Sequence, residues 1–225
     1  MIEFYHVNKH YKPNWPVLQD VNLKIDKGEF VLITGKSGSG KSTLLHLIYM
    51  NEFPVSGQVV VDGVNSLTVR KREIPILRRR IGMIFQEFHL LYDRTVYDNI
   101  ELPLLLTGCP RREIKKKALK VLAYAGLAHR MYEQPAFLSS GEKQRVCIAR
   151  AIVNSPIVLL ADEPMGSLDA DNSADILTLL KNINAGGTAV ILATHNPDWA
   201  RRMPLRCITV DKGRITEDRR SAQAL

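Results

Sequence analysis

A glycine-rich segment near the N-terminus has the residue types and spacing of a phosphate-binding loop. It reads G-x-x-x-x-G-K-S over residues 35–42, after an apolar run and before a helical pattern. Its glycines allow a tight turn in which backbone N–H groups point at phosphate oxygens, and the next helix adds the positive potential of its N-terminus. Lys41 is expected to reach the terminal phosphates, and the Ser42 hydroxyl is expected to ligate Mg²⁺. The predicted nucleotide-binding residues are Gly35, Lys36, Ser37, Gly38, Ser39, Gly40, Lys41, Ser42 and Thr43.

Two adjacent carboxylates, Asp162 and Glu163, follow the apolar run at residues 157–161. Because successive residues of a strand point to opposite faces, the two acids can take different roles. We expect Asp162 to hold Mg²⁺, directly or through water. We expect Glu163 to polarise the attacking water, a role in which a positioned base contributes about 10²–10⁴-fold. Alone, the pair could be an acidic loop at a strand end, but the phosphate-binding loop upstream favours the catalytic interpretation.

A third segment, residues 138–145, reads L-S-S-G-E-K-Q-R and precedes a helical pattern. Ser139 and Glu142 have the S-x-x-E spacing of a capping box, in which each side chain accepts a hydrogen bond from the backbone N–H of the other residue. The segment therefore predicts the start of a capped helix. A helix N-terminus is also a site for anions, so a structural and a phosphate-binding role are compatible here.

These segments need elements that hold them in place, and the chain alternates strand and helix patterns throughout. The run at residues 59–61, followed by Asp62-Gly63, predicts a strand and a tight turn, and a helix is expected over residues 42–50. Between residues 86 and 157 the pattern is mostly helical, which predicts a helical insertion of about seventy residues. The alternation predicts an α/β fold with a largely parallel sheet. Further buried strands are predicted at residues 30–34, 81–85, 157–161 and 188–194.

The bulk composition excludes several classes of protein. The chain has 225 residues, enough for one domain with a subdomain, and no apolar run approaches the length of a membrane span. No secretory signal is expected at the N-terminus. The three cysteines, Cys109, Cys147 and Cys207, lack the spacing of metal ligands, and they fit a reducing cytoplasm without a disulfide framework.

The net charge of +8 comes partly from basic clusters at residues 70–72, 78–80, 111–112 and 115–117. These clusters could be solvated helix faces. They could also contact anionic lipid headgroups, to which each basic residue near the surface contributes roughly 1 kcal/mol. Nucleic acid is the least favoured partner, because aromatic residues are not interleaved with the clusters.

The order of the segments along the chain resembles that of the ATP-binding cassette (ABC) ATPases. The set comprises the phosphate-binding loop, Gln86 after a strand, residues 138–142, Asp162-Glu163, residues 167–169 and His195 after a strand. The resemblance implies a P-loop NTPase fold of the ABC type, with a RecA-like core, an antiparallel β subdomain and an inserted α-helical subdomain. It implies one ABC domain over residues 1–225. The core and β subdomain would be residues 1–87 and 156–225, and the helical subdomain with the signature segment would be residues 88–155.

The resemblance also implies a shared site that binds ATP and Mg²⁺. Two cassettes would pack head to tail, so that the phosphate-binding loop of one and the signature segment of the other enclose each ATP. The implied signature residues are Ser139, Ser140, Gly141 and Glu142.

The same resemblance implies roles for residues outside these segments. Tyr11 would stack on adenine, Gln86 would touch Mg²⁺ or water as well as the helical subdomain, and His195 would contact the γ-phosphate. Gln86 and His195 therefore join Glu163 as implied catalytic residues. Ser42, Gln86 and Asp162 are the implied metal ligands, and Asp169 matches the loop that communicates across the dimer.

Residues 72–86 and 89–100 resemble one branch of the family, the bacterial cell-division ATP-binding subunits. This resemblance implies a polytopic membrane protein as partner, other division proteins nearby, no nucleic-acid partner, and a peripheral position on the cytoplasmic side of the inner membrane. ATP-driven closure would bend the membrane partner and switch on cell-wall hydrolases. The groove for the partner's cytoplasmic helix is expected near residues 86–91.

Two other functions stay open at this point, the ATPase of a lipoprotein-release or other exporter, and a non-catalytic ATP-dependent scaffold at the division site. Ser140 stands where the family usually has a second glycine, and the scaffold hypothesis assigns it a weakening of turnover. Lys143, Met165 and Ser167 also depart from the common pattern. None of these changes removes a residue that performs chemistry, so activity is expected.

Overall fold

The fold is built around a six-stranded sheet whose central strands are parallel and buried. This computed structural model describes residues 1–12, 15–196, 199 and 204–220. The strand order is β10-β9-β3-β8-β7-β6, and all pairs are parallel except β9 with β10. The predicted apolar runs are confirmed as strands to within one residue at each end. The bounds are β3 Phe30–Thr34, β6 Ile81–Ile84, β7 Val158–Asp162, β8 Ala189–Thr194, β9 Arg206–Asp211 and β10 Arg214–Arg219.

Alternate residues of these strands support two separate hydrophobic cores, one on each face of the sheet. On β3, Leu32 packs with the helices on one face, whereas Val31 and Ile33 pack with the elements on the other. All three side chains are fully buried. Both faces are therefore covered, which is why the strands read as continuous apolar runs rather than as alternating ones.

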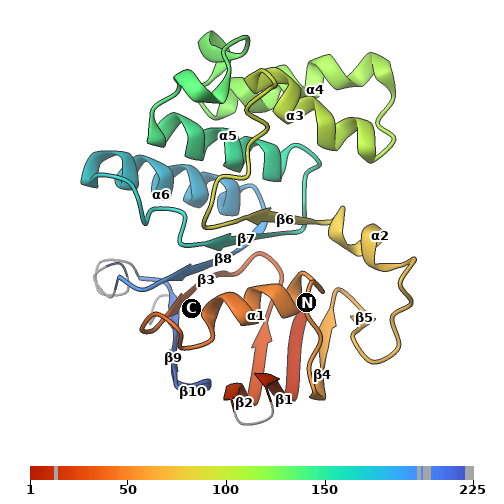
Figure 1. The fold of residues 1–225 in the computed structure, drawn as a ribbon, viewed down its shortest axis with the longest axis vertical. Coiled ribbons are helices and arrows are strands. Elements are labelled where there is room, and N and C mark those ends of the chain that lie inside the picture. Colours follow the sequence, from red (N-terminus) through yellow and green to blue (C-terminus); the bar gives the residue numbers. More distant parts are fainter. Residues whose placement is uncertain (13–14, 197–198, 200–203, 221–225) are drawn as a thin grey trace.

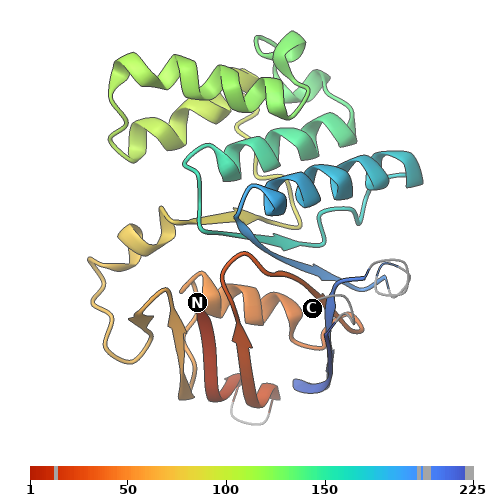
Figure 2. The same ribbon diagram turned by 180° about the vertical axis from the view of Figure 1, so that it is seen from behind.

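Helices cover both faces of this sheet (Figures 1 and 2). α5 and α6 lie against one face with α3 and α4 above them, and α1 lies on the opposite face. The predicted helix at residues 42–50 is confirmed as α1, and α3, α4 and α5 occupy the predicted helical insertion. The bounds are α1 Lys41–Ile48, α2 Ile74–Arg78, α3 Val96–Leu106, α4 Arg111–Tyr124, α5 Ser140–Ile152 and α6 Ala170–Ala185, with 3₁₀ turns at Ala128–Arg130 and Pro135–Phe137.

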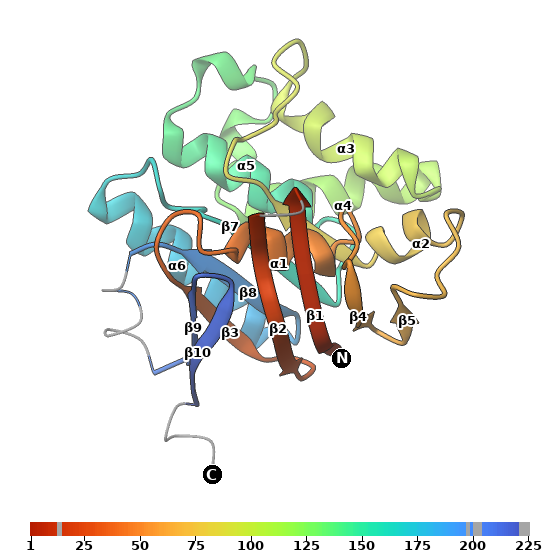
Figure 3. The ribbon, with the colours of Figure 1, turned by 60° about the horizontal axis from the view of Figure 1, so that its bottom comes forward.

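A second, antiparallel sheet lies beyond α1, and Figure 3 shows its first two strands running side by side in front of that helix. Its order is β2-β1-β4-β5. The predicted strand and turn at residues 59–63 are confirmed here, because the chain turns at Asp62-Gly63 from β4 into β5. The bounds are β1 Ile2–Lys12, β2 Trp15–Ile25, β4 Ser56–Val61 and β5 Val64–Asn65.

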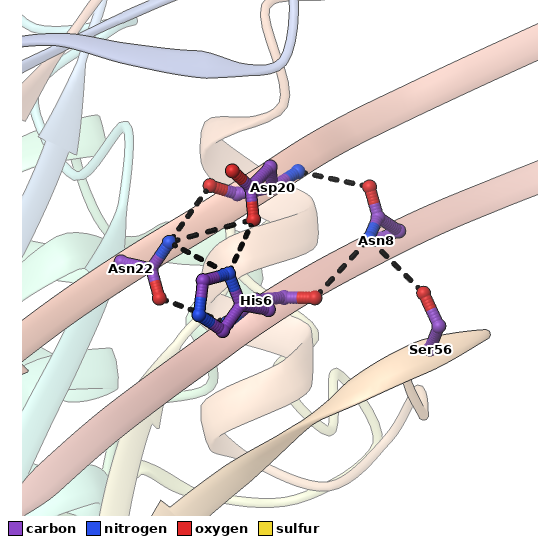
Figure 4. A network of polar contacts seen from close by, with 5 residues as sticks. All are labelled: His6, Asn8, Asp20, Asn22 and Ser56. Atoms are coloured by element: carbon purple, nitrogen blue, oxygen red, sulfur yellow. Dashed lines mark hydrogen bonds and ion pairs between the residues drawn. The ribbon is translucent and has the colours of Figure 1, made fainter.

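The pairing of β1 with β2 is interrupted by register shifts, which polar side chains stabilise (Figure 4). His6 and Asp20 both have φ of 49°, a left-handed conformation that takes their backbone out of the regular ladder. Their N–H groups donate instead to side chains, that of His6 to Asn22 Oδ1 at 2.9 Å and that of Asp20 to Asn8 Oδ1 at 2.9 Å. The side chains thus replace ladder hydrogen bonds that the irregular backbone cannot make.

A buried asparagine holds the segment after β6 against the start of α3. Asn99 is fully buried, and its amide nitrogen donates to the carbonyl oxygens of Leu91 at 3.1 Å and Thr95 at 2.9 Å. Its amide oxygen accepts the Leu91 N–H at 2.9 Å. One side chain therefore satisfies three backbone groups and determines the path from the sheet into the helical layer.

We expect Asn99→Ala to lower the free energy of unfolding by about 2–4 kcal/mol, because it removes these hydrogen bonds and leaves polar backbone groups unpaired. Urea denaturation would measure the change. Asn51→Ala, at an exposed asparagine, is the matched control and should change stability by less than about 0.5 kcal/mol. Equal effects for the two variants would show that Asn99 is not an anchor.

Candidate functional site

The predicted catalytic residues meet at one edge of the six-stranded sheet, where its parallel strands end. Thr34 of β3 pairs with Thr194 of β8, and Asp162 of β7 pairs with Ala193 of β8. The phosphate-binding loop, His195 and Glu163 therefore leave the sheet from neighbouring strand ends, and Gln86 follows β6 just beyond them. In an open parallel sheet, this edge is where ligands bind.

The phosphate-binding loop has the backbone that its glycines predict. Gly35 has φ of 148°, and a Cβ there would overlap the Val210 carbonyl oxygen and lie 2.7 Å from Ser39 Oγ. Only glycine fits this approach to β9. Lys41 is buried and folds back over the loop, where its Nζ donates to the carbonyl oxygens of Gly35 at 2.8 Å and Lys36 at 3.1 Å. The cation thus lies over the space that the loop encloses.

Several polar groups of the site lack partners within the chain. The N-cap of α1 is Gly40, so no side chain accepts a hydrogen bond from the first N–H groups of that helix, and its first turn holds no acidic residue. Ser39 Oγ and Asp162 Oδ1 are buried without a hydrogen-bond partner; among the described residues, Gln144 Nε2 of α5 is the other such side-chain atom. Buried polar atoms are normally paired, so the loop and the end of β7 are built to meet a polar ligand.

Asp162 has the environment of a metal ligand. Burial raises the pKa of this carboxyl above its usual value, and a hydrogen bond from the Ser42 hydroxyl offsets only part of that rise. Its unpaired oxygen and the Ser42 hydroxyl are the hard oxygen donors that Mg²⁺ prefers. No cluster of three or more His, Cys, Asp or Glu side chains is arranged for a metal within the described ranges. One carboxylate and one hydroxyl are hard donors that fit Mg²⁺, which usually takes one or two protein ligands beside phosphate and water.

Glu163 lies between a cation and an imidazole. Its φ of 49° turns the chain sharply at the end of β7, while its N–H donates to the Ala193 carbonyl oxygen at 3.0 Å. Glu163 Oε1 lies 2.9 Å from His195 Nδ1 and 3.9 Å from Lys41 Nζ. A cleft of about 420 Å³ adjoins this carboxylate, and its lining includes His195, Ser173 and Trp199. The largely buried carboxylate is therefore oriented by two groups and lines the cleft.

Tyr11 and Gln86 lie at opposite limits of the site. The Tyr11 hydroxyl forms a hydrogen bond of 3.4 Å with Thr43 Oγ1, which links β1 to the start of α1. Tyr11 is 55% exposed, and Lys9 Nζ lies 5.1 Å from the centroid of its ring. An exposed ring beside the phosphate-binding loop suits stacking on a base. Gln86 is exposed directly after β6, at the sheet edge that carries Glu163.

The predicted capping box of the signature segment is confirmed. Ser139 Oγ accepts the Glu142 N–H at 3.2 Å, and Glu142 Oε2 accepts the Ser139 N–H at 2.8 Å. The Ser139 N–H and hydroxyl and the Arg130 guanidinium hold the pKa of Glu142 below its usual value. Ser140 is the first helical residue, and it is exposed. Its Cβ therefore meets no crowding within the chain.

The structure places the site residues in two groups. α5, with the signature segment, lies on one face of the sheet, and α1 lies on the other (Figure 1). Among the described residues, no hydrogen bond or ion pair joins residues 139–142 to residues 35–43. The second group also contains Asp169, which caps α6 and accepts the Asn172 N–H at 2.8 Å. One chain thus supplies two half-sites that do not meet within it.

Asn172 is a member of the second group that the sequence analysis missed. It occupies the N3 position of α6 after the capping Asp169, and its side-chain nitrogen donates to Asp169 Oδ2 at 2.7 Å. The available signal was Asp169, an N-cap residue before a helical pattern, but the helix-start pattern has Glu or Gln at the third position after the cap and does not single out an asparagine there. Its contact with the signature segment joins residues far apart in the chain, and no local pattern indicates such a contact.

Comparisons with known proteins agree with this geometry. The sequence pattern of the family described as ABC transporter matches residues 18–166. The chain is 46% identical over 219 residues to the cell division ATP-binding protein FtsE of Mycobacterium tuberculosis, covering 97% of this chain and 95% of that protein. It is 45% identical over 215 residues to the FtsE of Escherichia coli K12, covering 96% of this chain and 97% of that protein.

Solved structures also place the fold of this chain among ATP-binding cassettes. A dimeric, post-hydrolysis state of the ATP-binding cassette MJ0796 bound to ADP and phosphate superposes with a TM-score of 0.87 at 37% identity. Another dimeric MJ0796 structure has a TM-score of 0.88 at 38% identity, and each comparison covers 98% of both chains. With the two half-sites and the α/β fold described above, these findings show that the chain belongs to the ABC transporter family, as an ATP-binding cassette ATPase.

Proposed function

We propose that this ATPase works as a homodimer that closes around two Mg-ATP and drives a conformational change in an FtsX-like polytopic membrane protein, thereby regulating cell-wall hydrolysis in cell division. The observation that carries the dimer is the separation of the two half-sites in one chain. A second copy, packed head to tail, supplies the missing half. The cell-division part is supported by the identity to FtsE proteins along nearly the whole chain.

Each group of the first half-site has a distinct task. The loop N–H groups and Lys41 bind the phosphates, Tyr11 stacks on the base, and Ser42 and Asp162 hold Mg²⁺, with Gln86 near the metal and water. Mg²⁺ supplies charge neutralisation at the phosphates when bound. Glu163 accepts a hydrogen bond from the attacking water and polarises it. His195, 2.9 Å from the Glu163 carboxylate, orients that carboxylate and meets the γ-phosphate.

The second half-site closes the nucleotide from the partner copy. The exposed start of α5, with Ser139, Ser140 and Gly141, presents the positive end of a helix to the terminal phosphate across the interface. Asp169 lies beside it and reaches the same interface. Because the γ-phosphate is the feature that both copies contact, its loss on hydrolysis removes the contact that favours the closed dimer.

A groove of about 380 Å³ between the core and the helical layer suits the partner's cytoplasmic helix. Its lining includes Phe85, Leu106 and Arg150. Arg150 donates to the carbonyl oxygens of His89 at 2.6 Å and Phe88 at 2.8 Å. The groove thus adjoins the expected region at residues 86–91. A displacement of the partner's helix in the groove would move this segment and, through it, Gln86.

The proposed place of action is the cytoplasmic face of the inner membrane, with the chain held there peripherally. In the described part of the chain, no helix has the length and apolar character needed to cross a bilayer. In this proposal the membrane partner holds the chain at the bilayer, and other division proteins approach through that partner.

We expect Leu106→Asp to reduce recovery of the chain with its FtsX-like partner at least tenfold, because it removes an exposed apolar side chain of the docking groove and places a carboxylate where the partner's helix would pack. Affinity purification of the co-expressed pair would measure this. Leu106 is 69% exposed, so the variant should fold and keep the ATPase rate of the isolated chain.

Leu67→Asp is the matched control, because Leu67 is 66% exposed and does not line this groove. Recovery of the native chain with a lipoprotein-release permease instead of the division partner would contradict the division function. Equal recovery of both variants with the division partner would contradict the groove as the docking site, but it would leave the division function standing.

A further inference from the structure

The starts of α5 and α6 lie side by side, and the two helices run in the same direction (Figures 1 and 2). α5 begins with the signature segment after Ser139, and α6 begins after Asp169. The proposed dimer uses both starts, because both segments face the partner copy. The contacts that hold the two helix starts at a constant separation within one chain are therefore relevant to closure of the dimer.

One side chain, that of Asn172, bridges the two segments. Its backbone N–H and its Nδ2 both donate to the Asp169 carboxylate, at 2.8 and 2.7 Å. This pair of bonds orients the amide, so that its oxygen points toward Gly141. A Cβ at Gly141 would overlap Asn172 Oδ1 and lie 2.9 Å from Asn172 Cγ. The Asn172 amide thus occupies the space that a side chain at position 141 would need.

A second contact lies one turn further along both helices. Arg145 Nη2 donates to Asp175 Oδ2 at 2.7 Å, while Arg145 Nη1 donates to the Ala125 carbonyl oxygen at 3.3 Å. Beneath these polar contacts, Val146 and Ile176 belong to one hydrophobic core. The Asn172 contact is therefore the first of these contacts along the two helices, at the starts that would meet the partner in the proposed dimer.

We propose that Asn172 is a positioning residue that keeps the signature segment and Asp169 at a constant spacing, so that the partner's nucleotide-loaded loop engages both together. The proposal rests on the sandwich dimer proposed above. Without the Asn172 bridge, the two helices stay joined from Arg145 and Asp175 onward, but the spacing of their first turns varies more, and a smaller fraction of molecules has both segments in place. Because both copies of the homodimer must have their segments in place, the apparent dissociation constant rises by the inverse square of that fraction.

The functional test uses the full chain carrying Glu163→Gln, which retains ATP in the dimer. Asn172→Leu in this background should raise the dimer dissociation constant in saturating Mg-ATP about tenfold, measured by analytical ultracentrifugation. Binding of a fluorescent ATP analogue to the monomer, at protein concentrations far below dimerisation, should change less than twofold. Asn182→Leu, at an exposed asparagine near the far end of α6, is the matched control.

The outcomes separate the inference from the proposed dimer. A dissociation constant equal to that of the Asn182→Leu control would overturn the role of Asn172, and so would a parallel loss of monomer nucleotide affinity. A Glu163→Gln protein that stays monomeric in Mg-ATP would instead contradict the dimer itself, and in that case the role of Asn172 falls with it.

A double-mutant cycle, measured by the melting temperature of the nucleotide-free chain, tests the contact between Gly141 and Asn172 independently of dimerisation. Gly141→Ala should lower the melting temperature by about 3–8 °C, because the new Cβ meets the Asn172 amide. Combining it with Asn172→Ala should restore part of that loss, since the smaller side chain vacates the space. Additive losses in the double variant would show that the contact does not exist in solution.

Discussion

Glu163→Gln is expected to slow ATP turnover by about 10²–10⁴-fold and to accumulate an ATP-bound dimer. The carboxylate lies 2.9 Å from His195 Nδ1 and opens onto the cleft at the end of the parallel strands. Glutamine keeps the size and a carbonyl oxygen for the water, but it removes the negative charge that polarises that water. Binding of ATP uses other groups, so the closed state persists while its decay is blocked.

Phosphate release and size-exclusion chromatography, both in saturating Mg-ATP, would measure the two effects. Glu133→Gln, at an exposed glutamate outside the site, is the control and should leave turnover unchanged. Equal phosphate release by the native chain and Glu163→Gln would favour the non-catalytic scaffold that the sequence left open. A Glu163→Gln protein that eluted as a monomer would contradict the sandwich dimer, whereas a monomer without nucleotide would not.

The parallel sheet was predictable because burial on both faces makes a strand a continuous apolar run. The runs ending at Thr34 and Asp162 are of this kind, and the chemistry follows directly at their ends. The start of α5 was predictable for a different reason, because a capping box is a local pattern and its hydrogen bonds join residues three positions apart.

β1 and β2 could not be located from the sequence, although the family resemblance implied an antiparallel subdomain. The bulged positions His6 and Asp20 break the alternation that identifies a half-buried strand. Asn8 and Asn22 belong to a residue type that is depleted in strands, yet here they hold those bulges together through hydrogen bonds to the backbone. The role of such side chains can be recognised only when the pairing of the two strands is known.

Parts of the site also lie beyond sequence reasoning. The need for glycine at position 35 comes partly from Val210 on β9, and the need for glycine at position 141 comes from Asn172 on α6. These contacts join residues that are far apart in the chain. Ser140 is the opposite case. It is exposed at the start of α5, so its own chain does not crowd it, and in the proposed dimer only the nucleotide of the second copy would lie against it.

Lys41→Ala is expected to weaken ATP binding by at least about 100-fold. The Lys41 ammonium is 6% exposed and donates to the carbonyl oxygens of Gly35 and Lys36, so it is held above the loop before any phosphate arrives. A hydrogen bond to a charged group is worth about 1.5–3 kcal/mol, and two of them to phosphate oxygens correspond to a loss of about 10²–10⁴-fold. Titration with a fluorescent ATP analogue would measure the loss.

Lys41 Nζ also lies 3.9 Å from Glu163 Oε1, so removing the ammonium leaves a largely buried carboxylate with less compensating positive charge. Lys41→Met separates this effect from the loss of phosphate contacts, because it retains the apolar stem and the packing. If Lys41→Met has the melting temperature of the native chain and still loses ATP, the ammonium itself binds phosphate. Lys27→Ala, at an exposed lysine outside the loop, should bind ATP normally. Native ATP affinity in both Lys41 variants would contradict the assignment of the loop as the nucleotide site. Among the residues that the structure describes, Lys41 is the one cation that the carbonyl groups of the loop hold over it.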